Sequence, residues 1–303
     1  MSKILQLEKV VKTYDKYTAV NEVSFDMAQG AIFGLLGPNG AGKTSIIRII
    51  TTITRADSGM VYLDGEPLNS QHPEQIGYMP EERGLYKKMK VGEHLMYLAQ
   101  LKGLSYRQAK EEINTWFQKL EITDWWNKKV EELSKGMQQK IQFIATVVHR
   151  PKLLILDEPF SGLDPINTNL LKDTIYELHQ QGMSIIFSTH RMEQVEEICD
   201  NIVLINKGLN VLEGRVKDIK NQFKENLFKI DYEGALPPDL KARANVVREN
   251  SHSITVQLTE ERQSNELLQY LLQQGVYIHA FNEILPTLNE IFIKRVEEAN
   301  MLN

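Results

Sequence analysis

The most informative part of this sequence is the octapeptide Gly37-Pro38-Asn39-Gly40-Ala41-Gly42-Lys43-Thr44. It matches the spacing G-x-x-x-x-G-K-[ST] of a phosphate-binding loop, the P-loop. The apolar run at 32–36 predicts a buried strand before the loop, and the isoleucines of 45–53 predict a helix with a broad apolar face after it. The motif therefore lies between a strand and a helix, which is the context it requires.

A loop of this kind is suited to the phosphates of a nucleotide. Its glycines let the backbone wrap around a polyphosphate with the N–H groups pointing inward, and the helix that follows adds the positive end of its dipole. Lys43 can reach the β- and γ-phosphates, and the hydroxyl of Thr44 is a ligand for Mg²⁺. The alternative is a glycine-rich turn that binds nothing, but Lys43-Thr44 and the flanking elements favour a nucleoside triphosphate site.

Length and composition are those of a globular protein. The 303 residues are enough for one large domain and a smaller one, each with its own core. A net charge of −5 gives no basic surface for nucleic acid or an anionic membrane. The one cysteine, Cys199, excludes an internal disulfide and fits a reducing compartment. Because the sequence has no apolar run of membrane-spanning length and no signal-peptide pattern, we expect a cytosolic protein.

Two adjacent acids end a second apolar strand. The run at 153–156 is followed by Asp157 and Glu158. Burying a charge is costly unless it has a partner, and Mg²⁺ beside Asp157 would supply one. Glu158 would then lie next to the γ-phosphate, where a carboxylate can orient or deprotonate a water. His190 follows the apolar strand at 183–188, and ligands bind at the carboxyl ends of strands in α/β sheets, so we expect His190 in the same site.

Two further positions have both a structural and a functional interpretation. Tyr14 lies between two predicted strands before the P-loop, and it is either an ordinary core residue or a ring that stacks on the nucleotide base. Ser134 stands where the N-cap of a helix at about 137–149 is expected, and the cap alone would explain it. The residues themselves leave these alternatives open.

The rest of the sequence indicates a division into domains. Turn signals at 57–65 predict a small antiparallel sheet, and helical periodicity dominates about 87–150. After about Ile219, short strands and two helices predict a separate α+β domain without a recognisable catalytic constellation. We therefore predict a nucleotide-binding domain at 1–218, with a helical subdomain at about 87–150, and an accessory domain at 219–303.

Taken in order, the motifs resemble those of an ABC-type ATPase. They are the P-loop, LSKGMQQ at 133–139, LLILDEP at 153–159, SGLD at 161–164 and His190. Together they resemble the nucleotide-binding subunit of an ABC transporter over residues 1–218. GYMPEERGLY at 77–86 and the C-terminal domain further resemble the sodium-extrusion, NatA-type bacterial export ATPases. The implied fold is an α/β P-loop NTPase core with a small antiparallel β subdomain and a helical subdomain, plus a small C-terminal α+β domain.

The resemblance implies a role for each motif residue. Nucleotide contacts are implied for Tyr14, Gly37, Pro38, Asn39, Gly40, Ala41, Gly42, Lys43, Thr44, Ser45, Glu81, Ser134, Gly136, Gln139 and Asp164. Mg²⁺ ligands are implied at Thr44, Asp157 and Glu81, and the catalytic residues would be Lys43, Glu158 and His190. Tyr14 would stack on adenine, and His190 would sense the γ-phosphate. Ser134 and Gly136 would contact the ATP of an opposing subunit, and Asp164 would link the two sites across that interface.

The resemblance also implies partners. Two ATPase subunits, identical or related, would enclose two ATP molecules, and ATP-driven dimerisation would power export through membrane-spanning permease subunits on separate chains. The protein would lie on the cytoplasmic face of the cell membrane and would have no nucleic acid partner. Export rather than import rests on the NatA-like features alone. The C-terminal domain either stabilises or regulates the pair of subunits or is a passive extension.

One residue departs from the family pattern, and two other classes of protein fit less well. Glu81 stands where the family usually has glutamine, and its charge would either bind Mg²⁺ more strongly or repel the γ-phosphate. A soluble ABC ATPase acting on ribosomes or DNA would carry a second P-loop with basic linkers, or a long coiled coil. This chain has one P-loop, no sustained heptads and a net negative charge. A P-loop kinase is disfavoured by the 133–139 motif and by the acid pair.

Overall fold

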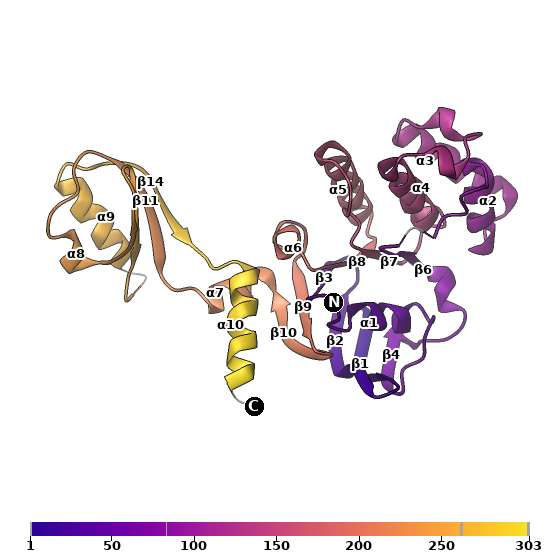
Figure 1. Cartoon of the computed structure of the whole chain (residues 1–303), viewed down its shortest axis with the longest axis horizontal. Helices are drawn as coiled ribbons and strands as arrows, with labels where there is room; N and C mark the ends of the chain where they lie inside the picture. The colour runs from indigo at the N-terminus through magenta and orange to yellow at the C-terminus, as the bar shows by residue number, and fades with distance from the viewer. Residues whose placement is uncertain (1, 83, 261–262, 302–303) are drawn as a thin grey trace. The chain divides into compact units, whose positions relative to one another are not determined.

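The chain folds into two compact units, residues 1–214 and residues 215–303. The computed structural model describes residues 2–82, 84–260 and 263–301. Figure 1 labels the helices and strands of both units. All the predicted site residues belong to the first unit, which is therefore described in more detail.

A six-stranded sheet in the order β10-β9-β3-β8-β7-β6 forms the centre of the first unit. Its strands are β3 (Ile32–Leu36), β6 (Ile76–Met79), β7 (Leu153–Asp157), β8 (Ser184–Thr189), β9 (Asn201–Asn206) and β10 (Leu209–Arg215). The strands from β9 to β6 pair in parallel. Every residue of β3, β7 and β8 is buried, which is why these strands are continuous apolar runs rather than alternating ones.

A smaller antiparallel sheet in the order β2-β1-β4-β5 lies beside the P-loop helix. Its strands are β1 (Lys3–Tyr14), β2 (Tyr17–Ala28), β4 (Ser58–Leu63) and β5 (Glu66–Pro67). The four isoleucines of α1 (Lys43–Ile50) share one apolar core with the inward-facing residues of this sheet and with β3. The core therefore fixes the start of α1, and with it the P-loop, against both sheets.

Helices form the part of the first unit that was predicted at about 87–150. They are α2 (Val91–Leu101), α3 (Tyr106–Lys119) and α4 (Lys135–Val147), with short 3-10 turns at η2 (Thr123–Trp125) and η3 (Val130–Glu132). Another 3-10 turn, η1 (His72–Gln75), precedes β6. Figure 1 shows α2, α3 and α4 grouped together. Two more helices, α5 (Pro165–Gln180) and α6 (Met192–Ile198), follow β7 and β8. Helix α5 was not predicted, because only four of its residues are buried and its apolar face is correspondingly weak.

The second unit is a small α+β domain. Its antiparallel sheet has the order β12-β13-β11-β14. The elements are α7 (Val216–Gln222), β11 (Leu227–Glu233), α8 (Leu240–Arg243), β12 (Asn245–Glu249), β13 (Ser253–Gln257), α9 (Gln263–Gln273), β14 (Tyr277–Ile284) and α10 (Leu288–Met301). Alternate residues of β11 and β13 form its core with one face of α9, as a half-buried sheet requires.

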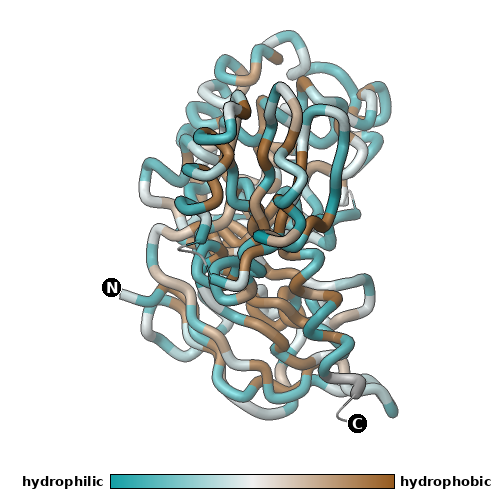
Figure 2. The backbone as a smooth tube through the Cα atoms, turned by 90° about the vertical axis from the view of Figure 1, so that its left-hand side faces the viewer, coloured by the Kyte–Doolittle hydropathy of each residue, from teal (hydrophilic) through white to brown (hydrophobic). Residues whose placement is uncertain are grey.

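The hydrophobic residues follow this architecture. In Figure 2 they gather along the strands, whereas the helices alternate hydrophobic and hydrophilic residues. Within the described ranges, no helix combines the length and the apolar character needed to cross a bilayer. The predicted fold class is confirmed: an α/β core with a small antiparallel sheet and a helical part, followed by a small α+β domain.

Candidate active site

Several of the predicted site residues lie at the carboxyl ends of parallel strands. The P-loop follows β3, Glu81 follows β6, Asp157 ends β7 and His190 follows β8. The strand order β3-β8-β7-β6 therefore brings four distant segments of the chain to one edge of the sheet. Ligands of α/β proteins bind at this edge.

Two glycines of the P-loop are required by the surrounding backbone. Gly37 has a φ of 147°, and a Cβ on it would lie 2.1 Å from the carbonyl oxygen of Ile205 in β9. Gly42 has a φ of 112°, and a Cβ there would lie 2.3 Å from the carbonyl oxygen of Ala19 in β2. Backbone atoms of paired strands cannot move aside as a flexible side chain can. Only glycine therefore fits at either position.

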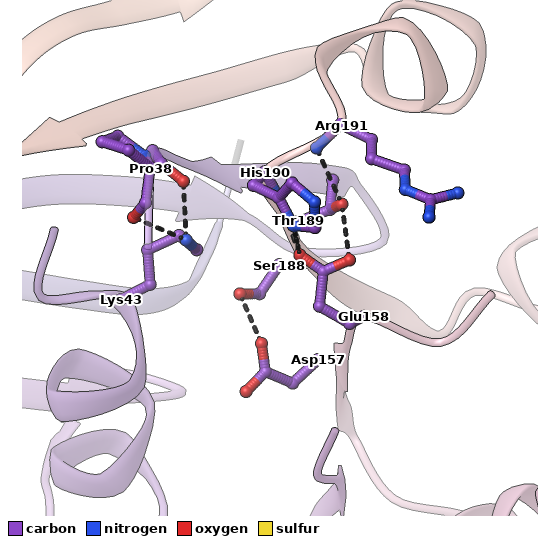
Figure 3. A network of polar contacts seen from close by, with 9 residues as sticks. Pro38, Lys43, Asp157, Glu158, Ser188, Thr189, His190 and Arg191 are labelled. Atoms are coloured by element: carbon purple, nitrogen blue, oxygen red, sulfur yellow. Dashed lines mark hydrogen bonds and ion pairs between the residues drawn. The ribbon is translucent and has the colours of Figure 1, made fainter. Parts of the chain in front are cut away.

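Lys43 is the cation of the site. Its Nζ donates hydrogen bonds to the carbonyl oxygens of Gly37 at 2.6 Å and Pro38 at 3.1 Å (Figure 3). Burial lowers the pKa of Lys43, although the nearby carboxylates of Glu158, Asp157 and Glu81 act in the opposite direction. An anionic ligand would add to the carboxylates and stabilise the charged ammonium.

A pocket of about 220 Å³ opens in front of the P-loop. It is lined by Tyr14, Tyr17, Ala19, Asn39, Gly40, Ala41, Gly42, Lys43, Thr44, Ser45, Glu81, Asp157 and Glu158. Most of the predicted nucleotide-binding and metal-binding residues are thus brought together in one place. Gly37 and Pro38 lie immediately behind it, where their carbonyl groups hold Lys43.

Two tyrosines border this pocket, although only one was predicted. Tyr14 and Tyr17 are register partners at the end of the β1–β2 hairpin, and their exposures are 39% and 55%. Tyr14 is therefore not a core residue. The Tyr17 hydroxyl donates to the carbonyl oxygen of Gly40 at 3.1 Å, which ties the hairpin to the P-loop. The pairing of the two rings across a tight turn was the signal in the sequence that could have identified Tyr17.

Asp157 is a buried carboxyl group whose charge is compensated only in part. Burial raises the pKa of Asp157, and the hydrogen bond from Ser188 and the charge of Lys43 oppose this only in part. The Ser188 hydroxyl donates to Oδ1 of Asp157 at 2.7 Å (Figure 3). A cation beside this carboxyl group would stabilise its negative charge and so offset the effect of burial.

The residues around Asp157 fit a Mg²⁺ ion. Asp157 and the exposed Thr44 line the same pocket and offer the carboxylate and hydroxyl oxygens that this ion prefers. Among the described residues, no group of three or more histidine, cysteine, aspartate or glutamate side chains is placed to hold a metal. The remaining ligands of an ion here would come from phosphate oxygens and water, as is usual for Mg²⁺.

Glu158 is the centre of a hydrogen-bond network. Its Oε1 accepts the backbone N–H of His190 at 2.8 Å and lies 2.6 Å from Nδ1 of the same residue, while Oε2 accepts the Thr189 hydroxyl at 2.9 Å (Figure 3). Its backbone adopts a φ of 49°, a left-handed conformation that costs roughly 1–2 kcal/mol outside glycine. The network and a bond from the Glu158 N–H to the Ser188 carbonyl hold it there.

His190 contacts Glu158 but is not among the described residues that line the pocket. Its side chain is 44% exposed, although Nδ1 contacts the buried carboxylate. One face of the imidazole is thus fixed by the protein, and the rest remains accessible. As predicted, His190 lies beside the acid pair, where it contacts Glu158.

Three predicted residues near the starts of α4 and α5 lie away from this pocket. Ser134 is the N-cap of α4 and accepts the Met137 N–H at 3.3 Å, so the cap interpretation is correct. Asp164 is the N-cap of α5, and hydrogen bonds from Asn167 lower the pKa of Asp164. Gly136 lies in the first turn of α4. None of these residues lines the pocket beside the P-loop.

Gln139, which the resemblance predicted as a nucleotide contact, is a buried residue of α4. It is only 4% exposed, and its Nε2 donates to the carbonyl oxygen of Pro159 at 2.9 Å. The side chain thus connects α4 to the segment that follows Glu158. In this chain its amide nitrogen serves the packing of that segment, because a buried amide needs a hydrogen-bond partner.

Fold and site together are those of an ABC-type ATPase: a P-loop, an acid pair after a neighbouring strand, a histidine after the strand between them, and a capped helix carrying the 133–139 motif. Comparison with protein families agrees. The ABC transporter family model matches residues 20–161. A second model, the C-terminal domain of DrrA1-3-like ATP-binding proteins, matches residues 214–296.

Individual relatives match either nearly the whole chain or about 70% of it. The uncharacterized ABC transporter ATP-binding protein YhaQ of Bacillus subtilis (strain 168) is 45% identical over 295 residues, which are 97% of this chain and 98% of the relative. The ABC transporter ATP-binding protein NatA of the same organism is 33% identical over 216 residues, 70% of this chain and 85% of NatA. A solved structure of an ATP-binding subunit of an ABC transporter, 29% identical, superposes with a TM-score of 0.68 over 73% of this chain and 93% of that one.

This chain belongs to the family of ABC transporter ATP-binding proteins. It is an ATPase of that family, and its nucleotide is ATP. The resemblance seen in the sequence, including that to NatA, is confirmed.

Proposed function

We propose that this chain hydrolyses ATP between Lys43 and Glu158 and powers export through membrane-spanning subunits on separate chains. The network that joins Glu158 to His190 beside the P-loop pocket carries the proposal. Transfer of a phosphoryl group to water depends on positioned charges rather than on covalent chemistry by the protein. An ammonium, two carboxyl groups and an imidazole at one edge of the sheet are the groups needed for it.

Each group has a defined task in this proposal. Lys43 and the amides of the P-loop hold the phosphates, and Glu158 orients or deprotonates the attacking water. His190 contacts the γ-phosphate with its accessible face while Nδ1 stays with Glu158. Tyr14, with Tyr17 beside it, offers an exposed ring for stacking on the adenine base.

The proposed metal ligands are Asp157, Thr44 and Glu81. When bound, Mg²⁺ would neutralise charge that develops on the phosphates. Asp157 supplies a buried carboxylate and Thr44 an exposed hydroxyl. Glu81 adds a third carboxylate to a pocket that already contains Asp157 and Glu158. Without a cation, this charge would repel a triphosphate.

Replacing the extra carboxylate should therefore change how strongly nucleotide binding depends on the metal. We expect Glu81→Gln to bind ATP about tenfold more tightly than wild type in EDTA, because one nearby negative charge is worth about 1–2 kcal/mol in a partly solvated site. With saturating Mg²⁺ the difference should shrink or reverse. Equilibrium binding of a fluorescent ATP analogue measures both affinities.

The matched control for this measurement is Glu82→Gln, which removes the same charge from an exposed position outside the pocket. It should leave both affinities at the wild-type value. Equal tightening of the Glu81→Gln variant with and without Mg²⁺ would mean that Glu81 only repels the nucleotide and is not a metal ligand.

A second ATP-binding subunit, identical or related, would complete the site. Ser134 and Gly136 lie at the start of α4, away from this chain's own pocket. A Cβ on Gly136 would meet only ordinary contacts, at 3.8 Å from Asn167 and Leu163. Packing within the chain thus does not require glycine at this position. Close approach of the γ-phosphate of an ATP bound to the second subunit would require it. Asp164 would connect the two sites across the interface.

Introducing a negative charge at position 136 tests whether a second subunit completes the nucleotide site. Gly136→Asp should fold normally, since an acidic residue in the first turn of a helix is favoured by the helix dipole. It should also bind ATP in its own P-loop. Hydrolysis should fall by about 100-fold or more, the usual cost of losing one group that stabilises transition-state charge. Steady-state phosphate release and ATP binding, measured on the same sample, separate the two effects.

Asn289→Asp is the control, because Asn289 is exposed and occupies the same second position of α10 that Gly136 occupies in α4. It should leave hydrolysis unchanged. If Gly136→Asp hydrolyses ATP at the wild-type rate, the α4 motif does not contact a second nucleotide.

The remaining parts of the proposal concern location and organisation. We place the ATPase work in residues 1–218 and an accessory role in residues 219–303, a division that the compact units 1–214 and 215–303 support. The membrane-spanning partners and a position on the cytoplasmic face of the cell membrane are those the family resemblance implies. Export is favoured by the similarity to NatA-type proteins. Nothing in the charge of the chain favours a nucleic acid partner.

A further inference from the structure

The last two residues of β8 are hydroxyl residues with no assigned role. Ser188 and Thr189 are both 0% exposed. A buried hydroxyl group destabilises a protein unless it has a hydrogen-bond partner. Each of the two hydroxyl groups donates to a different acid: Ser188 donates to Asp157, and Thr189 donates to Glu158 (Figure 3).

Strand geometry explains this one-to-one match. In the parallel pairing of β7 with β8, Asp157 is the register partner of Ser188. Successive side chains of a strand point to opposite faces of the sheet. Ser188 therefore meets Asp157 on one face, and Thr189 is directed to the other, where the left-handed turn at Glu158 places the second carboxylate.

The direction of the Thr189 hydrogen bond is fixed by its other partner. The backbone N–H of Arg191 lies 3.0 Å from Oγ1 of Thr189. An N–H group can only donate and a carboxylate can only accept, so the threonine oxygen accepts from Arg191 and its single proton goes to Oε2 of Glu158. With the His190 N–H on Oε1, both oxygens of the Glu158 carboxylate are held, and its plane cannot rotate freely.

Ser188 orients the other acid. Its hydroxyl lies 2.7 Å from Oδ1 of Asp157, and Figure 3 shows the second carboxyl oxygen pointing away from Ser188. Neither Ser188 nor Thr189 is among the described residues that line the pocket. They touch the acids rather than a ligand.

We propose that Ser188 and Thr189 are positioning residues with separate tasks, Ser188 for the metal-binding carboxyl group of Asp157 and Thr189 for the hydrolytic carboxylate of Glu158. The inference rests on the function proposed above for these two acids. Hydrogen-bond partners of this kind change affinity or activity by about 10–100-fold when they are removed. Their effects here should appear in different measured quantities, because the acids they hold act in different steps.

The test compares four variants of the full chain. Thr189→Val keeps the shape and removes the hydroxyl, so kcat should fall about 10–100-fold while the Kd for ATP with Mg²⁺ stays within about twofold. Thr189→Ser restores the hydroxyl and should recover most of kcat. Ser188→Ala should raise the Mg²⁺ concentration that half-saturates ATP binding by about 10–100-fold, an effect read without turnover. Thr174→Val removes another buried threonine hydroxyl, bonded only within α5, and should change neither quantity.

The outcomes separate this inference from the proposed function. A wild-type kcat in Thr189→Val, or a Thr189→Ser variant as slow as Thr189→Val, would overturn the role of the hydroxyl. Parallel loss of ATP binding in Thr189→Val and Ser188→Ala, with a lowered unfolding temperature, would show a merely structural role and also overturn it. If instead Glu158→Gln hydrolyses ATP at the wild-type rate, the proposed function itself fails, whatever these variants do.

Discussion

Glu158→Gln is expected to bind ATP with wild-type affinity and to hydrolyse it about 10²–10⁴-fold more slowly, the range lost when general-base help is removed. The carboxylate lies at the P-loop pocket, and three contacts from Thr189 and His190 fix its direction. A glutamine side chain can still accept two of these hydrogen bonds through its carbonyl oxygen, so the fold should survive. It carries no negative charge and cannot take a proton from water.

Phosphate release and equilibrium ATP binding, measured on the same preparation, check this result. Glu193→Gln is the matched control: it neutralises an exposed carboxylate on α6, three residues beyond His190, and should hydrolyse ATP normally. Wild-type turnover by Glu158→Gln would remove Glu158 from the chemistry. Loss of ATP binding would instead assign it a structural role.

Gly42→Ala should be the most damaging small substitution in the P-loop. The new Cβ would lie 2.3 Å from the Ala19 carbonyl oxygen, and the backbone would be held in a left-handed conformation. Strain and overpacking together predict a loss of about 2–5 kcal/mol in the free energy of unfolding. If the loop moves to relieve the contact, each lost amide–phosphate hydrogen bond removes about 1.5–3 kcal/mol, so ATP affinity should fall at least tenfold.

Gly182→Ala separates the two causes of this loss. Gly182 also has a left-handed φ, 91°, but a Cβ there would meet nothing within 4 Å. It should be destabilised by only about 1 kcal/mol and bind ATP normally. Denaturant unfolding and ATP titration of both variants measure the difference. Equal destabilisation of the two would mean that the contact with Ala19 does not constrain the loop.

The sequence was sufficient to predict which polar segments lie together at one edge of the central sheet. The P-loop, the acid pair and His190 each follow an apolar strand, and parallel strands bring their carboxyl ends to one edge of a sheet, so spacing and polarity predicted their meeting. The two domains were predicted from the change in hydrophobic pattern after about Ile219. These signals lie within short stretches of the chain, so one sequence is enough to recognise them.

Two of the residues that the sequence did not predict depend on contacts between distant segments. Ser188 and Thr189 look like ordinary ends of a strand until the register with β7 places each beside an acid. Tyr17 is defined as a pocket residue by its pairing with Tyr14 across the hairpin. For Ser188 and Thr189, no local pattern specifies which neighbour the side chain contacts.

The central claim is that this ATPase works on membrane-spanning chains, and it is tested most directly by what copurifies with it. The full chain would be tagged in its native cell, extracted in mild detergent, and analysed for bound proteins and nucleic acid. We predict recovery of a multi-spanning membrane protein together with two ATP-binding subunits per complex. Recovery of ribosomes, DNA or only soluble proteins would contradict the transporter function and favour the soluble ABC ATPase instead.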